Sequence, residues 1–131
     1  MNRPKTIFCD IDGTLVNHGS PTDVADPGYS MQILAGTHDV LNEWDNSGYR
    51  IILTTGRKES LRPVTEKQLS TAGIIYDQLV MGIGGGDRIL VNDRKPCGRR
   101  TAWAVVSHRD KGLNGKVFEN LSEIAEKYFI T

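Results

Sequence analysis

Short apolar runs, each about as long as a strand, recur along the chain. Residues 5–10, 50–54 and 78–81 are apolar without regular polar alternation, and residues 88–92 and 102–106 repeat the pattern. Strands that are apolar throughout are typical of a parallel sheet covered on both faces, because neither face meets water. The pattern therefore predicts a parallel sheet built from these five segments.

Helical segments lie between the early runs. Residues 37–47 place Val40, Leu41 and Trp44 on one face, and residues 60–72 begin with a serine and a proline that suit the first turn of a helix. A glycine follows each segment where a helix would stop. Strands that alternate with helices predict an α/β domain.

The segment at residues 16–36 has little periodicity and contains several glycines and prolines. We interpret it as a loop or small hairpin that forms a flap, because long loops inside compact domains are usually functional. It is too short for a separate cap domain, so residues 1–131 are expected to form one domain with an open site. The glycine-rich residues 82–86 are expected to be a flexible connector, and residues 121–129 a closing helix.

Composition excludes several classes of protein. The chain has 131 residues, of which 38% are hydrophobic and 24% charged, with a net charge of zero. No apolar run approaches the roughly 18–20 residues that cross a membrane, and no signal-peptide core follows the N-terminal charges. We therefore expect a cytoplasmic protein with no membrane partner. Cys9 and Cys97 are too few for a disulfide framework.

Chemically useful side chains fall at the ends of three predicted strands. Asp10, Thr55 and Asp93 each lie at or just after the last residue of an apolar run. Ligands of open parallel sheets bind at the carboxyl ends of the strands. These three residues are therefore expected to converge on one site.

Three motifs appear in order along the chain. Residues 10–15 read Asp-Ile-Asp-Gly-Thr-Leu after an apolar strand, residues 51–56 are an apolar strand ending in Thr-Gly, and residues 91–93 read Val-Asn-Asp. Together they resemble the motifs of the haloacid dehalogenase-like superfamily. The resemblance implies a three-layer α/β/α Rossmann-like domain of the small cap-less type, with a parallel sheet in the order 3-2-1-4-5.

The second aspartate of the first motif narrows the implied chemistry. Dehalogenases of this superfamily lack it and the transport ATPases carry threonine there, so Asp12 indicates a phosphatase or a phosphomutase. A mutase normally carries a sizeable cap, for which this chain has no room. The resemblance therefore implies an enzyme that hydrolyses phosphoric monoesters.

The resemblance also assigns roles to single residues. Asp10 would attack phosphorus and become an aspartyl phosphate, while Asp12 would act as acid and then as base. Mg²⁺ would be held by the Asp10 side chain, the Asp12 main-chain carbonyl and the Asp93 side chain. The expected substrate-binding residues are Gly13, Thr54, Thr55, Gly56 and Arg57. Thr55 is favoured over Thr54 as the residue that binds the phosphoryl oxygens.

The lysine that usually balances the nucleophile is missing from its common place. Small relatives often carry it in a Gly-Lys-Pro segment after the third strand, where residues 82–84 read Gly-Ile-Gly. We expect Lys95 to replace it as a catalytic residue, with Arg57 and Arg88 as alternatives. The missing lysine keeps a second hypothesis open, a catalytically weak module that binds a phosphate compound.

Basic residues gather after the second and fourth predicted strands, whereas acidic residues predominate before residue 55. Such clusters near a site favour a substrate that carries charge beyond its scissile phosphate. We expect a small phosphorylated metabolite, either a sugar phosphate or a nucleotide. A polynucleotide 3′-phosphatase is the alternative, since a basic surface also suits an extended polyanion. A homo-oligomer is a further option, because cap-less relatives sometimes close the site with a second subunit.

Overall fold

The computed structural model describes residues 3–113. Its elements are β1 (Thr6–Asp10), α1 (Pro21–Ala25), α2 (Thr37–Asn46), β2 (Arg50–Thr54), the 3-10 helix η1 (Glu59–Leu61), α3 (Arg62–Thr71) and β3 (Gln78–Val80). They confirm the first three predicted strands and both early helices. The helix expected at residues 121–129 lies outside the described residues. Within the described range, none of the helices has the length and apolar character needed to cross a membrane.

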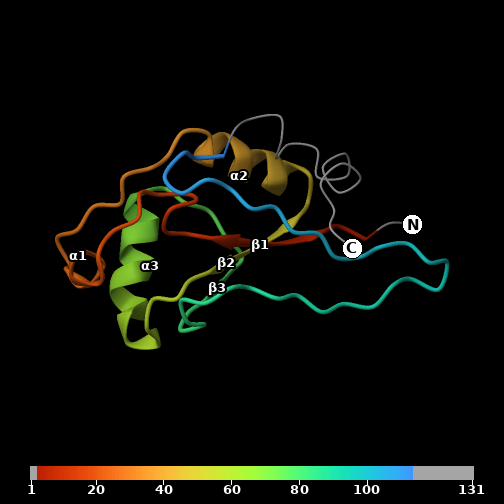
Figure 1. Cartoon of the computed structure of the whole chain (residues 1–131). Coiled ribbons are helices and arrows are strands. Elements are labelled where there is room, and N and C mark those ends of the chain that lie inside the picture. The colour runs from red at the N-terminus through yellow and green to blue at the C-terminus, as the bar shows by residue number, and fades with distance from the viewer. Residues whose placement is uncertain (1–2, 114–131) are drawn as a thin grey trace.

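The three strands form a parallel sheet in the order β1-β2-β3 (Figure 1). Asp10 is the register partner of Thr54, and Thr54 is the partner of Val80. The carboxyl ends of all three strands are therefore level, as a shared site requires. The parallel α/β architecture is confirmed, together with the 3-2-1 part of the expected strand order.

One face of this sheet is covered by α2 and α3. Both helices connect neighbouring strands in the same direction across the sheet, and right-handed crossovers in one direction place their helices on one face. The side chains shared by this core include Cys9, Val40, Leu41, Trp44, Ile51, Leu53 and Leu69. On β1, Phe8 stays 58% exposed. The described residues thus supply one helical layer and the sheet, while the third layer of the expected sandwich is not among them.

The strands expected at residues 88–92 and 102–106 are not formed in the described structure. Every residue from 82 to 100 is exposed, including Val91 at 89%. Figure 1 shows the segment after β3 running toward the end of the sheet where the chain begins and then returning. A strand needs a backbone partner as well as an apolar pattern, and within residues 3–113 no ladder forms along the free edge of β1. A local turn forms instead, in which the Lys95 N–H donates to the Arg99 carbonyl at 3.1 Å.

The flap at residues 16–36 leaves the sheet and returns to it through a short antiparallel base. Val16 and Ile33 form an isolated antiparallel bridge, and the Asn17 N–H donates to the Gln32 carbonyl at 2.8 Å. The flap contains α1, whose Ser20 cap accepts from the N–H of residue 23 at 3.1 Å. This arrangement is the small hairpin expected from the sequence.

Candidate active site

Two carboxylates stand where β1 ends and the chain turns. Asp10 is the last residue of β1, and the carbonyl of the buried Ile11 accepts from the N–H groups of Leu15 at 2.9 Å and Val16 at 3.2 Å. Gly13 has a φ of +87°, which a side chain would strain, so this tight loop depends on glycine. The loop places Asp10 and Asp12 two residues apart at the sheet edge.

The Asp10 carboxylate lies in an environment that disfavours its charge. Loss of surrounding water raises the pKa of Asp10 above its usual range, and the charge of Asp12 adds to that rise. A backbone hydrogen bond from Ile11, a 3.4 Å hydrogen bond from the Thr14 hydroxyl and the charge of Arg88 act in the opposite direction. Asp10 is still an exposed residue, so a ligand can reach it. A cation at this position would relieve the unfavourable charge.

The second motif lies beside Asp10 across the sheet. Because Thr54 is the register partner of Asp10, the two side chains emerge on the same face of the sheet. Thr55 is 2% exposed, and its hydroxyl oxygen accepts from the N–H of Arg57 at 3.0 Å. A methyl group on Gly56 would come within 2.7 Å of the Gly84 carbonyl oxygen. The glycine-rich segment therefore packs against this turn, and only glycine permits that approach.

Asp12 is paired with Arg57 in a bidentate contact. The Nη2 and Nε atoms of Arg57 donate to Oδ1 at 2.8 Å and Oδ2 at 2.9 Å. The Arg57 side chain is 4% exposed and that of Asp12 17%, so the pair is largely screened from water. A planar guanidinium fixes both oxygens of a carboxylate at once. In this structure Arg57 holds Asp12, while its expected contact with substrate stays a prediction.

Two polar residues of α3 support Arg57 from behind. Its Nη1 donates to the Thr65 hydroxyl at 3.2 Å and to the Gln68 side-chain carbonyl at 2.6 Å. Both partners are buried, at 0% and 5% exposure. Sequence reasoning missed them, although polar residues three positions apart on the buried face of a helix were a usable signal.

Asp93, the expected third metal ligand, and Lys95, the expected catalytic lysine, lie in the exposed turn of residues 92–101. The Thr101 hydroxyl donates to the Asp93 carbonyl, and the Gly98 N–H donates to the Lys95 carbonyl at 2.7 Å. In the described part of the chain, no cluster of three or more His, Cys, Asp or Glu residues could hold a metal ion. The strand that would carry Asp93 to the sheet edge is not formed among the described residues, so a joint hold of Asp10 and Asp93 on one ion stays a prediction.

Asp110 is a further contact that sequence reasoning did not find. Its N–H donates to the Gly13 carbonyl at 2.8 Å, and its Oδ1 accepts from the His18 N–H at 2.8 Å. Its φ of 60° is uncommon for a residue other than glycine. Asp110 thus ties the 108–113 segment to the first motif and to the start of the flap, a link that no local pattern indicates.

A model of the family described as haloacid dehalogenase-like hydrolase matches residues 7–77, more than half of the chain. The chain belongs to this family. The matched range begins in β1 and ends just before β3, so it contains both carboxylates of the first motif, the Thr54–Arg57 turn and the α3 residues behind it. No curated protein matches this hydrolase significantly.

Solved structures also resemble this haloacid dehalogenase-like hydrolase. A structure of a Pnkp1/Rnl/Hen1 complex shares 29% identity over 66% of this chain and 30% of that one, with a TM-score of 0.53. A Pnkp1/Rnl/Hen1 RNA repair complex shares 31% identity over 60% of this chain and 25% of that one, with a TM-score of 0.50. This hydrolase thus spans under a third of either chain.

A third solved structure, an MCSG target from Vibrio cholerae, matches in fold over most of the chain. It shares 21% identity over 93% of this chain and 94% of that one, with a TM-score of 0.57. At that identity the likeness concerns the fold alone. It supports the α/β fold of this hydrolase.

Proposed function

We propose that this protein is a magnesium-dependent phosphomonoester hydrolase that works through an aspartyl phosphate on Asp10. One observation carries the proposal: two carboxylates at the end of β1 have opposite surroundings. Asp10 is exposed and has no ion-pair partner within residues 3–113, whereas Asp12 is held at both oxygens by Arg57. A nucleophile has to reach the substrate, and an acid–base group has to be oriented toward it.

The proposed reaction has two steps. An Asp10 oxygen attacks phosphorus and the bond from phosphorus to the ester oxygen breaks. Asp12, protonated on an oxygen lone pair that Arg57 does not occupy, gives that proton to the leaving oxygen and becomes the carboxylate. Asp12 then takes a proton from water, which attacks the aspartyl phosphate, releases inorganic phosphate and restores the Asp10 carboxylate. Thr55 and the main-chain N–H groups around Gly56 would bind the phosphoryl oxygens. Gly13 would let the main chain approach the phosphate closely.

The oxygen donors at the end of β1 fit Mg²⁺. This ion binds through one or two carboxylates and retains waters and substrate oxygens as further ligands. The Asp10 carboxylate and the Asp12 main-chain carbonyl would hold it, and the raised pKa of Asp10 means that a cation there would be stabilising. When bound, the ion would neutralise charge on the phosphoryl group. We keep Asp93 as a proposed third ligand, which would require its segment to pair along the free edge of β1.

A screen of sugar phosphates, nucleotides and 3′-phosphorylated oligonucleotides with Mg²⁺ tests the proposal. We expect release of inorganic phosphate, abolished in Asp10→Asn and by EDTA, and restored when Mg²⁺ is added in excess. Asp23→Asn, an exposed carboxylate of α1, is the matched control and should retain activity. Full activity in Asp10→Asn would refute the assigned nucleophile. Phosphate binding without any turnover would favour the binding-module hypothesis.

A polynucleotide 3′-phosphatase is the second candidate. The RNA repair complex to which the chain is similar at 31% identity supports it, as do the exposed basic residues Arg94, Lys95, Arg99 and Arg100. A polyanion bound at such residues would release counterions, so its affinity should fall steeply with salt. Measuring KM for a 3′-phosphorylated oligonucleotide and for a mononucleotide over a range of salt separates the candidates. Equal KM values with no salt effect would exclude the polynucleotide substrate.

A further inference from the structure

We propose that Gln68 is a positioning residue that couples the flap, residues 16–36, to Asp12 through Arg57. The inference rests on the proposed function, because that function makes Asp12 the acid and base. A continuous series of hydrogen bonds runs from Asp12 to Arg57, from Arg57 to Gln68 and from Gln68 to the main chain of the flap. It joins Asp12, just after β1, to the last turn of α1 and the residue that follows it.

The two ends of the Gln68 amide have different partners. Its Oε1 accepts from Arg57 Nη1 at 2.6 Å, and its Nε2 donates to the Val24 carbonyl at 3.0 Å and the Asp26 carbonyl at 3.5 Å. A guanidinium can only donate and main-chain carbonyls can only accept, so this orientation of the amide is the one that satisfies all partners. Glutamine is thus the side chain that can serve both sides together.

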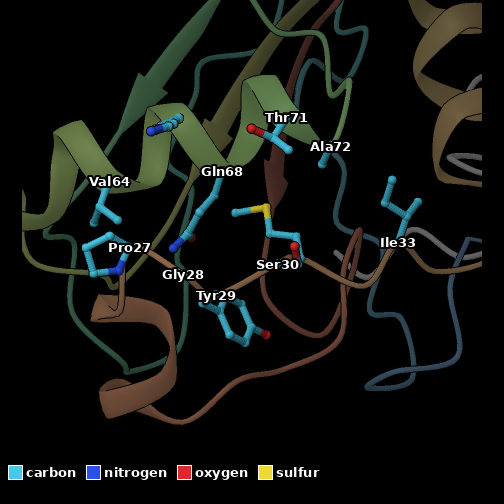
Figure 2. A pocket seen from close by; sticks show the side chains of 11 residues that line it. Pro27, Gly28, Tyr29, Ser30, Ile33, Val64, Gln68, Thr71 and Ala72 are labelled. Atoms are coloured by element: carbon cyan, nitrogen blue, oxygen red, sulfur yellow. The ribbon is translucent and has the colours of Figure 1, made fainter.

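The hydrogen bonds of Gln68 lie in a largely buried region beside a cavity. Gln68 is 5% exposed, so only a small part of its side chain meets solvent. A cavity of about 320 Å³ lies between residues 27–33 of the flap and α3, with Gln68 in its wall. Figure 2 shows the Gln68 side chain extending from α3 toward the loop of Pro27 and Gly28. This cavity reduces the van der Waals contact between the flap and α3. The hydrogen bonds of the Gln68 amide are therefore important for the position of the flap.

This connection has a consequence for catalysis. A shift of the Val24 or Asp26 main chain would move the Gln68 amide and with it the acceptor that holds Arg57. The Arg57 fork in turn sets the plane of the Asp12 carboxylate. A misplacement of about 1 Å in a reacting group can cost roughly 100-fold in rate. The flap would therefore influence the chemical step without touching the reacting atoms.

Two substitutions separate the two sides of the network. Gln68→Glu keeps an acceptor for Arg57 but sets a carboxylate oxygen against the two flap carbonyls. Thr65→Val removes an acceptor of Arg57 and leaves the flap bonds in place. Gln78→Glu, the same chemical change at an exposed residue of β3, is the matched control. The measurements are kcat and KM on the substrate with the highest turnover, and hydrogen exchange of flap amides.

We expect Gln68→Glu to lower kcat roughly tenfold or more with KM little changed, since orientation of a catalytic group acts on the transition state. Exchange should become faster at residues 20–29 and stay unchanged in β2 and α2. Thr65→Val should lower kcat without faster flap exchange, and Gln78→Glu should change neither. A wild-type kcat in Gln68→Glu would overturn the proposal. Equally faster exchange in every segment would also overturn it, because that reports global destabilisation.

A measurement without turnover distinguishes this proposal from the proposed function. Asp12→Asn weakens the Arg57 fork, since an amide offers only one acceptor atom. If the connection holds, exchange becomes faster at residues 20–29 in Asp12→Asn, although the flap residue that bridges to Asp12 is Val16, which lies outside that range. Unchanged flap exchange would overturn the connection. Failure of the wild-type protein to hydrolyse any phosphomonoester would refute the proposed function, and the exchange result would still decide the connection.

Discussion

The guanidinium of Arg57 holds the carboxylate of Asp12 at both oxygens, with N–O distances of 2.8 and 2.9 Å. The two residues are 45 positions apart in the sequence and meet because β1 and β2 are neighbours in a parallel sheet. The contact distinguishes Asp12 from Asp10, which has no ion-pair partner among the described residues. It is the basis for assigning the two carboxylates different roles.

Arg57→Ala should reduce both stability and activity. Removing one partner of a largely buried ion pair leaves the other charge uncompensated, which costs about 3–5 kcal/mol of unfolding free energy. Arg57→Lys keeps the charge but cannot hold both oxygens of Asp12 at once. We therefore expect this variant to lose less unfolding free energy than Arg57→Ala while its kcat still falls. Urea unfolding and steady-state kinetics measure the two effects. An Arg57→Ala variant as stable as the wild type would contradict the structural importance of the pair.

Asp10→Asn should raise the stability of the metal-free protein at neutral pH. Burial, reinforced by the charge of Asp12, raises the pKa of Asp10, so the folded state binds this proton more tightly than the unfolded chain does. The contribution of Asp10 to stability is then complete below the unfolded-state pKa and is lost as pH rises through the folded-state pKa.

Urea unfolding of both proteins in EDTA, at acid and at neutral pH, checks this prediction. The advantage of Asp10→Asn should be larger at neutral pH than below the unfolded-state pKa, where the wild-type carboxyl is protonated in both states. Mg²⁺ should stabilise the wild type more than the variant. An advantage that does not depend on pH would show that the carboxylate is not strained by its surroundings.

Gly36→Ala should destabilise the protein far more than Gly48→Ala. The two glycines have φ values of +83° and +78°, so alanine bears a similar backbone cost of roughly 1–2 kcal/mol at each. At Gly36 the added methyl group would also lie 2.1 Å from the Leu113 carbonyl oxygen, whereas nothing lies within 4 Å of it at Gly48. The difference between their unfolding free energies reports how residue 113 docks at the start of α2. Equal losses would contradict that docking.

Arg88→Ala should reduce kcat/KM more than Lys95→Ala. The charge of Arg88 lowers the pKa of Asp10, although burial, two hydrogen bonds and Asp12 all act on it more strongly. Arg88 is therefore the alternative to Lys95 that we expect to balance the nucleophile. Losing such a charge should cost roughly tenfold or more in rate. Arg50→Ala, at the exposed amino end of β2 and so at the opposite end of the sheet from Asp10, is the control. A larger loss in Lys95→Ala would restore the lysine expected from the sequence.

Much of the first half of the fold could be predicted from local pattern. The apolar runs at β1, β2 and β3, the buried stripe of α2 and the glycines that end both helices each lie within a few consecutive residues. Asp10, Asp12 and Thr55 could be placed in the same way, because each follows a recognisable strand. The first motif and its neighbour across the sheet were therefore accessible without coordinates.

The later segment shows where that reasoning ends. Residues 88–92 have the composition of a strand, but a strand exists only when another backbone accepts its hydrogen bonds. In the described structure the free edge of β1 does not do so, and Asp93 stays with its own turn. An apolar pattern identifies a segment that could form a strand. It does not show whether a neighbouring strand pairs with that segment.

The sequence by itself determined that a parallel α/β sheet ends in two carboxylates, because strand, turn and motif are all written in neighbouring residues. Only the tertiary structure decided which carboxylate is paired and which is open. That difference depends on Arg57, whose buried guanidinium is oriented toward Asp12 by its position after β2 and by its hydrogen bond to Gln68 of α3. It depends equally on the two neutral side chains behind it, whose role arises from packing between distant segments.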